Sequence, residues 1–310
     1  MNFAGTLPVF IVINLLTVCV KCEFSVMSVL SSGFNKVSKI IQNVECNFVE
    51  CCTTEYISSD IDKLDGILNK ELFGQEIAHR VIINALYGHL TSSNPPKALT
   101  MSFHGPPGTG KTYISQLIAK VLYKNGDQSK FYHFFNGRND FPLQEKVNEY
   151  KEELYTIIIN SLQKCERSMF VFDEVDKMPE GSSRITQRLL TLWGEGKQRR
   201  TTKLQDFENL ISIGAFNEKG GFYHSDTIDS SVIDHYVPFL PLEEVHVKKC
   251  LEKAFLNRGV YPTSDMIEEG LSYVVFGPPP HNIYATKGCK RLEQKVAAIV
   301  YANKKTKIEF

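Results

Sequence analysis

The residues whose types and spacing could do chemistry lie first in one stretch, Phe103–Thr112, which reads F-H-G-P-P-G-T-G-K-T. The stretch contains three glycines, Gly105, Gly108 and Gly110. Glycine adopts backbone angles that are barred to residues with a Cβ, so such a loop can turn its N–H groups toward a phosphate. Lys111 would reach the β- and γ-phosphates, and the Thr112 hydroxyl would hold Mg²⁺. Because a plain glycine turn needs neither residue, the pattern predicts a site for a nucleoside triphosphate.

A pair of carboxylates, Asp173 and Glu174, follows the short apolar segment Ser168–Phe172. If this segment is a buried strand, it delivers both carboxylates to the C-terminal edge of a sheet, where open α/β sheets bind ligands. Asp173 would then orient Mg²⁺, and Glu174 would polarise the attacking water as general base. Acidic residues can also simply end a strand, but the upstream phosphate loop favours the chemical role.

Strand and helix patterns alternate around these residues and predict an α/β fold with a mostly parallel sheet. Strands are expected at Ala98–Phe103, Phe131–Phe135, Ser168–Phe172 and Ile233–Leu240. Helices are expected over 60–72, from Gln75 to Asn94, and over 113–123, 142–163 and 184–193. The pattern becomes helical from Glu243, with segments near 243–259, 265–275 and 288–302. We therefore expect a nucleotide-binding domain over 60–242 and a small helical domain over 243–310.

Composition sets outer limits on function. The chain has 310 residues, of which 43% are hydrophobic, so it can form one large domain or two smaller ones, each with a core. Its 35 basic and 35 acidic residues give a formal net charge of zero, which offers no general reason to expect nucleic acid as a partner. The polar, basic segment Gly194–Lys203 is predicted to be a solvated loop rather than a phosphate-binding patch.

The N-terminus carries a short apolar run, Val9–Val20. The run is too short to span a bilayer comfortably and fits a secretory signal peptide over residues 1–22, although no Lys or Arg precedes it. The alternative is a buried N-terminal element. Cleavage after Cys22 would leave six of the eight cysteines, an even number that is compatible with disulfides in an oxidising compartment.

The segment over residues 23–59 contains three cysteines, Cys46, Cys51 and Cys52. No histidine lies in this segment and a fourth ligand is missing, so disulfides or free thiols are favoured over a metal site. The moderately apolar stretch Phe24–Val29 leaves two alternatives open, a contact with a membrane surface or a helix packed on the main domain.

The chain resembles the torsin family in the combination L-F-G-Q, G-P-P-G-T-G-K-T, F-V-F-D-E-V-D-K-M, G-K-Q-R, F-N-E-K-G-G-F-Y-H-S, V-P-F-L-P-L-E and K-G-C-K, in this order. Torsins are AAA+ ATPases of the endoplasmic reticulum lumen and nuclear envelope, related to the Clp/HSP100 unfoldases. The resemblance implies an AAA+ domain with a helical lid, ATP and Mg²⁺ as ligands, chaperone-like output and assembly into homo- or hetero-oligomers.

The resemblance also assigns site residues. It implies a nucleotide-binding loop made of Gly105, Pro106, Pro107, Gly108, Thr109, Gly110, Lys111 and Thr112. Phe73 and Gly74, within Leu72–Gln75, would line the adenine pocket. Lys290 would be the sensor 2 cation at the γ-phosphate. Cys250 and Cys289 would form a redox pair beside it, whereas two buried thiols are the reading that the residues alone favour.

Two departures from the family concern the chemistry of the site. Most torsins carry Asn where Thr112 stands, so metal binding here is expected to be more conventional. Related Clp-type ATPases carry an arginine finger where this chain has Val232. The resemblance therefore implies that a partner donates the arginine, the luminal domain of a lamina-associated-polypeptide-type membrane protein. Weak hydrolysis is expected without that partner.

A third departure concerns the sheet. Between Met178 and Trp193 the family has several tens of residues more, including a strand that ends in the sensor 1 asparagine. Asn217 matches a later family motif and is not assigned to sensor 1. Loss of an internal strand is expected to expose two edges and remove a layer of core. Two hypotheses follow: a luminal torsin-like ATPase that remodels proteins or membranes, or a hydrolysis-deficient scaffold or inhibitory splice form that pairs with a full-length relative. A small-molecule P-loop kinase fits poorly, because it gives Lys290 no role.

Overall fold

A five-stranded sheet lies at the centre of the chain in the computed structural model, which describes residues 9–13, 46, 49–174, 181–211 and 233–306. The described strands are β1 (Val9–Ile13), β2 (Leu99–His104), β3 (Tyr132–Asn136), β4 (Met169–Asp173) and β5 (His235–Pro238). Their order in space is β3-β4-β1-β2-β5, with β3 parallel to β4 and β2 parallel to β5. The predicted α/β fold is confirmed, and the four predicted strands lie close to their expected positions.

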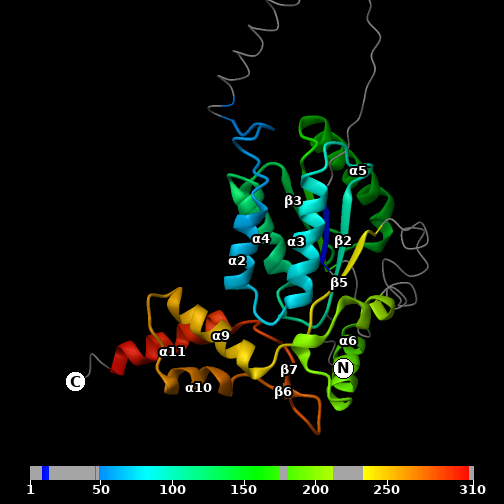
Figure 1. Cartoon of the computed structure of the whole chain (residues 1–310). Helices are drawn as coiled ribbons and strands as arrows, with labels where there is room; N and C mark the ends of the chain where they lie inside the picture. The colour runs from blue at the N-terminus through cyan, green and yellow to red at the C-terminus, as the bar shows by residue number, and fades with distance from the viewer. Residues whose placement is uncertain (1–8, 14–45, 47–48, 175–180, 212–232, 307–310) are drawn as a thin grey trace, which may run out of the picture.

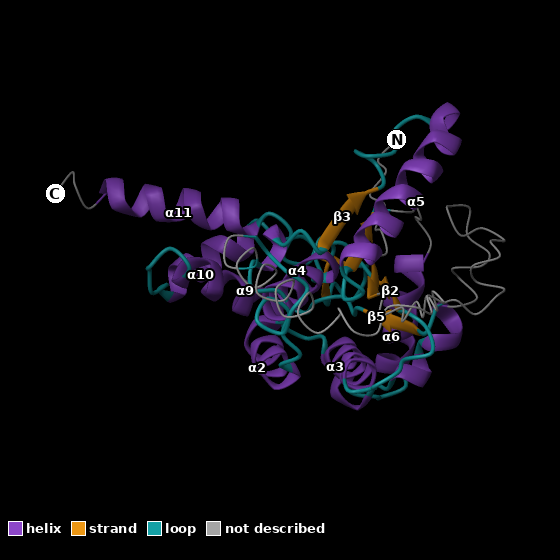
Figure 2. Cartoon of the chain, turned by 90° about the horizontal axis from the view of Figure 1, so that it is seen from above, coloured by secondary structure: helices purple, strands orange, loops and turns teal. Residues whose placement is uncertain are grey.

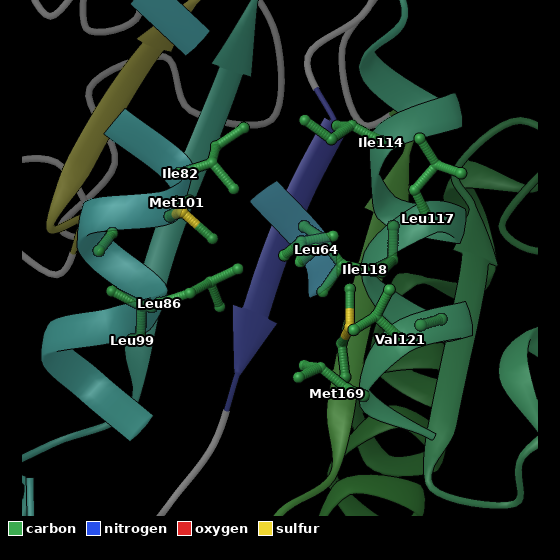
Figure 3. Packing of buried hydrophobic residues seen from close by; sticks show 14 of the residues in the cluster. Leu64, Ile82, Leu86, Leu99, Met101, Ile114, Leu117, Ile118, Val121 and Met169 are labelled. Atoms are coloured by element: carbon green, nitrogen blue, oxygen red, sulfur yellow. The ribbon is translucent and has the colours of Figure 1, made fainter. Parts of the chain in front are cut away.

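Strand β1 lies between β2 and β4 and runs antiparallel to both. Ile11 pairs with Met101 on one side and with Val171 on the other. Figure 3 shows β1 in dark blue between the two strands, pointing against β2. The expectation of two exposed edges is therefore wrong, because the N-terminal run fills the position between the phosphate-loop strand and the strand of Asp173. This arrangement corresponds to the alternative of a buried N-terminal element, and cleavage of a signal peptide stays a prediction.

Helices cover both faces of the sheet. The described helices before the lid are α2 (Ile61–Glu71), α3 (Glu76–Leu90), α4 (Lys111–Leu122), α5 (Val147–Lys164) and α6 (Gly181–Gly194). Figure 2 shows α2 and α3 on one side of the sheet and α5 on the other. Helix α2 begins as its sequence predicts, because the Asp60 side chain accepts a hydrogen bond from Lys63 N at 2.9 Å. Helix α5 begins later than predicted, after the 3₁₀ turn Gln144–Lys146.

The main core lies between α2, α3, α4 and the sheet, where apolar side chains at helical spacing meet alternate residues of the strands. Figure 3 shows the side chains that fill it, among them Leu64, Ile82, Leu86, Met101, Ile118 and Met169, all fully buried. Burying a side chain of this size stabilises the fold by about 1.5–3 kcal/mol. This core holds the helix that follows the phosphate loop against β2 and β4.

The C-terminal part forms a small helical unit, the lid, beneath the sheet domain in Figure 1. It contains α9 (Glu244–Leu256), α10 (Ser264–Ser272) and α11 (Leu292–Thr306), with a short hairpin of β6 (Phe276–Gly277) and β7 (Tyr284–Ala285). The three helices were predicted from the sequence, and the hairpin was not. The lid has its own core, which includes Val247, Leu251, Phe255, Val296 and Ile299.

A third apolar cluster connects α6 to the rest of the fold. Ile185 and Leu189 of α6 pack with Phe207, Ile77 of α3 and Leu240 after β5. The remaining described elements are short 3₁₀ turns at Gly126–Gln128, Arg199–Thr201 and Leu204–Asp206. This cluster places the segment after α6 next to the connection from β5 into the lid.

Disulfides hold the N-terminal segment on the fold. Cys46 is bonded to Cys51, and Cys52 is bonded to Cys165 at the end of α5. The three cysteines of this segment therefore form disulfides, one of the two states that the sequence favoured. The second bond spans 113 residues, and in a chain-entropy model a loop of this size adds about 4–5 kcal/mol of stability. Within the described residues no helix is long and apolar enough to cross a membrane.

Candidate active site

The phosphate loop connects β2 to α4 and has the backbone that only glycine tolerates well. Gly105, Gly108 and Gly110 have φ values of 151°, 70° and 106°. A Cβ built on Gly108 would lie 2.1 Å from the carbonyl oxygen of Lys287, so the loop and the lid are in backbone contact there. The predicted loop therefore exists, and the glycines allow both its curl and the close approach of the lid.

Lys111, the first residue of α4, lies buried beneath this loop. Its Nζ donates hydrogen bonds to the carbonyl oxygens of Gly105 and Pro106, both at 2.8 Å. Burial lowers the pKa of Lys111 to about 7, Asp173 opposes the shift, and the neighbouring charge of Lys290 adds to it. A phosphate beside Nζ would favour the charged form and raise this pKa again.

The low pKa of Lys111 predicts proton uptake when nucleotide binds. At pH 8.5 the buried amine is mostly neutral, and binding of Mg-ATP should charge it, so the complex should take up close to one proton. At pH 6 the amine is already charged and uptake should fall to about 0.1 proton. Calorimetry in two buffers of different ionisation enthalpy measures this number directly. Equally low proton uptake at both pH values would mean that Lys111 is already charged in the free protein. Lys111→Arg, which stays charged, is the control.

The Thr112 hydroxyl and the Asp173 carboxylate meet at the end of the sheet. Thr112 Oγ1 donates a hydrogen bond to Asp173 Oδ2 at 2.9 Å, across the position of β1. Oxygen ligands of this kind suit Mg²⁺, which commonly binds through one or two protein groups together with substrate phosphates and water. The residues therefore fit the ion: Thr112 and Asp173 would hold it, and it would neutralise negative charge on the phosphates.

Glu174 stands next to this pair in a conformation that is rare for its residue type. Its φ is 56°, in the left-handed region, and its N–H donates to Asp173 Oδ1 at 2.9 Å. Its carboxylate lies 3.6 Å from Arg138 Nε, and the two side chains are 27% and 68% exposed. An exposed ion pair at this distance is weak, so Glu174 can exchange Arg138 for a water molecule.

The lid supplies the opposite wall of the site. Cys289 N–H donates to Gly108 O at 3.0 Å, and a Cβ on Gly288 would lie 2.4 Å from the same oxygen. Cys289 is bonded to Cys250 of α9, the pairing that the family resemblance implied. Lys290 follows directly and lines a cavity of about 490 Å³ that it shares with Lys111 and the two acidic residues.

The cavity brings together most of the predicted site residues. Its lining includes Phe73, Pro107, Gly108, Thr109, Gly110, Lys111, Thr112, Asp173, Glu174, Cys250, Cys289 and Lys290. Gly105 and Pro106 instead hold Lys111 from behind, and Gly74 packs on His246 outside the cavity. The two positions that bear on the arginine finger and sensor 1, Val232 and Asn217, lie outside the described residues.

Sequence reasoning missed three lining residues that join the lid to the sheet domain. Glu71 at the end of α2 accepts a hydrogen bond from Tyr113 at 2.6 Å and forms an ion pair with Lys253 of the lid. Burial raises the pKa of Glu71, but the hydrogen bonds from Lys253 and Tyr113 outweigh it, so the pKa is lowered and the carboxylate stays charged. No motif marks these residues, because each lies on a helix face whose partner is distant in the chain.

The prediction of a solvated loop over Gly194–Lys203 is wrong for Arg199. Arg199 was expected in a solvated loop, but its side chain is only 11% exposed and donates to two backbone carbonyls. Its neighbour Arg200 is exposed, as predicted. The motif G-K-Q-R already contained Arg199, so the signal was present, but a basic run gives no indication of which member is buried.

A phosphate loop after a central strand, an acidic pair at the end of another strand and a helical lid over both define an AAA+ ATPase fold. The sequence model of the Torsin family matches residues 46–172. The chain is 35% identical to a torsin-like protein of Drosophila melanogaster over 301 aligned residues, which cover 84% of this chain and 87% of that protein. A torsin-like protein of Caenorhabditis elegans is 31% identical over 287 residues, covering 81% of each. This chain belongs to the torsin family.

The alignments also bear on the shortened region. The alignment with the fly protein has 301 positions, but it covers only 84% of the 310 residues of this chain. The difference of several tens of positions corresponds to gaps in this chain. The same holds for the worm protein, with 287 positions over 81% of the chain. This total is of the size expected for the segment that the family resemblance implies is missing between Met178 and Trp193.

Proposed function

We propose that this protein is a luminal torsin-like ATPase of the endoplasmic reticulum and nuclear envelope that hydrolyses ATP with Mg²⁺ to remodel proteins or membranes. The observation that carries the proposal is the 2.9 Å hydrogen bond between Thr112 and Asp173. It joins the phosphate loop to the acidic strand end at the one place where Mg²⁺ is needed. The pairing supports binding of Mg²⁺ together with the phosphates, and the turnover measurements below distinguish hydrolysis from binding alone.

Each residue of the site has a role in this proposal. Lys111 and the loop N–H groups bind the phosphates, and Thr112 and Asp173 hold Mg²⁺. Glu174 accepts a proton from the attacking water as general base. Lys290 responds to the presence of the γ-phosphate. It lies next to Cys289, whose disulfide with Cys250 connects it to helix α9 of the lid. The apolar wall at Phe73 suits the flat adenine base.

Three disulfides in the described ranges support an oxidising compartment. They pair Cys46, Cys51, Cys52, Cys165, Cys250 and Cys289. Reduction of the Cys250–Cys289 bond would free Cys289 from α9 and let Lys290 move. We therefore propose that thiol state is coupled to nucleotide binding at this site.

An arginine from a partner would complete the site. The described residues that line the cavity include three lysines, Lys111, Lys253 and Lys290, and no arginine. A torsin-like assembly with the luminal domain of a lamina-associated-polypeptide-type membrane protein would supply it. The protein client stays unassigned.

The first test measures ATP binding by calorimetry in the full chain and in Lys111→Ala. We expect Mg²⁺-dependent binding that the substitution removes, because the variant lacks the amine that lies beneath the loop. Arg200→Ala, an exposed basic residue, is the matched control and should bind normally. Absence of binding by well-folded wild type would leave the alternative, a scaffold or inhibitory form that pairs with a full-length relative.

Partner activation is the second test. Turnover should rise by about 10³-fold or more when the activator domain is added, as an arginine finger achieves elsewhere. The measurement is steady-state phosphate release with and without that domain. Equal turnover in both would show that this chain needs no arginine from a partner.

The alternative function is favoured by the shortened region alone. Transcript sequencing across the codons for Met178–Trp193 would discriminate between the two functions, since a longer major transcript would remove the alternative.

A further inference from the structure

The connection from β5 into the lid is held by side chains from two distant segments. Residues Leu240–Glu243 form this connection, and Figure 1 shows it passing beside α6. Gln75 holds one side, because Leu240 N–H donates to its Oε1 at 2.7 Å and its Nε2 donates back to Leu240 O at 2.8 Å. The same Nε2 lies 3.2 Å from Thr109 O, so the connection is tied to the phosphate loop.

Arg199 holds the other side. Its Nη1 donates to Pro241 O at 2.6 Å and lies 3.5 Å from Glu243 Oε1, and its Nη2 donates to Gly74 O at 2.5 Å. One planar guanidinium therefore fixes the distance between the loop that contains Gly74 and the start of the lid at Pro241. Two hydrogen bonds from a rigid fork define direction as well as distance.

Helix α9 is positioned from the same point. Glu243 N–H donates to His246 Nδ1 at 3.1 Å, at the start of the helix. Gly74 has a φ of 67°, and a Cβ there would lie 2.7 Å from the His246 ring, so loop and helix are in close contact. Because α9 carries Cys250 and Lys253, its position decides how far the lid wall stands from the phosphate loop.

The burial of Arg199 is costly in terms of stability. Among the described residues its Nε is buried without a hydrogen-bond partner, and Glu243 is its one counter-ion within 4 Å. Apolar residues of similar volume often stabilise a fold as well as or better than a buried ion pair. A guanidinium in this place therefore points to a geometric role rather than to a contribution to stability.

We propose that Arg199 is a positioning residue that sets the height of the lid over the nucleotide cavity, and thereby the affinity of the site for ATP. It does not line the cavity and touches no reacting atom. The inference rests on the proposed function, because it names what controls binding at that site. Arg199 follows α6 closely in the chain, so its hydrogen bonds also connect the segment after α6 to the entry of the lid.

The test compares Arg199→Met, which keeps volume and removes the fork, with Arg199→Lys, which keeps the charge but reaches one carbonyl. Arg200→Met is the matched control, since Arg200 is exposed and donates a hydrogen bond to the side chain of its near neighbour Gln198. We expect the Kd and KM for ATP to rise about tenfold in Arg199→Met, equal to about 1.4 kcal/mol, with kcat changed by less than about twofold. Arg199→Lys should restore part of the affinity.

Hydrogen exchange in the nucleotide-free protein keeps this test separate from the proposed function. Backbone amides over 240–247 should exchange about tenfold faster in Arg199→Met, while those of α4 keep their wild-type rates. Faster exchange in both regions would mean a general loss of stability and would overturn the proposal. Unchanged exchange at 240–247 would overturn it as well, even if affinity falls. Wild type that binds no ATP would remove the proposed function, and the exchange comparison would still decide the role of Arg199.

Discussion

Glu174→Gln should lower ATP turnover by about 10²–10⁴-fold while the Kd for ATP stays within about threefold of wild type. The amide keeps the volume of the carboxylate and its place at the end of β4, but it cannot accept a proton from water. Binding is expected to survive because the phosphate contacts come from Lys111 and the loop, and the metal contacts from Thr112 and Asp173. Turnover is measured with the activator domain present, so that the loss is not hidden by slow basal hydrolysis.

The matched control is Glu252→Gln on the exposed side of α9, which removes one carboxylate from the surface and should leave turnover unchanged. Turnover of Glu174→Gln above about one tenth of wild type would show that another group accepts the proton. Loss of binding together with turnover would instead assign Glu174 to nucleotide or metal binding. An Arg138→Ala variant adds a finer check, since releasing Glu174 from this contact should not lower turnover if the pair is only a resting contact.

Removal of residues 1–22 should destabilise the chain more than any single substitution named above. The deletion takes β1 out of the centre of the sheet, where it pairs with β2 and with β4. Strands lie about 4.8 Å apart, so β2 and β4 stand about 9.5 Å apart and cannot pair without a shift of one strand spacing. Each buried backbone group left without a partner costs about 1–3 kcal/mol, and a few such losses approach the total stability of a domain.

Two substitutions test the same strand if the truncated chain fails to fold. Ile11→Pro removes one N–H from the middle of β1 and should lower the free energy of unfolding by about 1–3 kcal/mol. Ile11→Val keeps the β-branched shape and should change it by less than about 1.5 kcal/mol. Urea unfolding measures both. Equal stability of the two variants would show that β1 does not occupy the sheet, and a truncated chain that folds and binds ATP would show that β2 and β4 can close together.

The parts of the fold that the sequence predicted are those that local patterns determine. The phosphate loop, the N-cap at Asp60 and the apolar spacing of α2, α4 and α9 each depend on neighbours within a few residues. The acidic pair was found because the change from apolar to charged residues marks the end of a buried strand in the sequence. The candidate site was predictable for the same reason, since its phosphate and metal groups lie at the ends of such local elements.

The parts that sequence reasoning missed depend on partners far along the chain. The apolar run at the N-terminus is compatible with a leader segment or a strand, and the strands that it pairs with, β2 and β4, lie far along the chain. Arg199 belongs to a basic run whose burial is decided by Gly74 and Pro241, two segments distant in the chain. The bond between Cys52 and Cys165 could not be chosen by counting cysteines, because several pairings satisfy an even number.

The central place of β1 has a consequence for how the chain acquires its fold. β1 is synthesised before the other described strands, yet its two partners follow it by about 90 and about 160 residues, so its pairings have high contact order and form slowly. The ribosome must release β4 before β1 can be enclosed on both sides. This strand is therefore among the last to be fixed, and the hydrogen bond between Thr112, at the start of α4, and Asp173, at the end of β4, cannot take its final geometry earlier. A leader peptidase acting during translation would compete with this step, so the mass of the mature N-terminus also reports which event comes first.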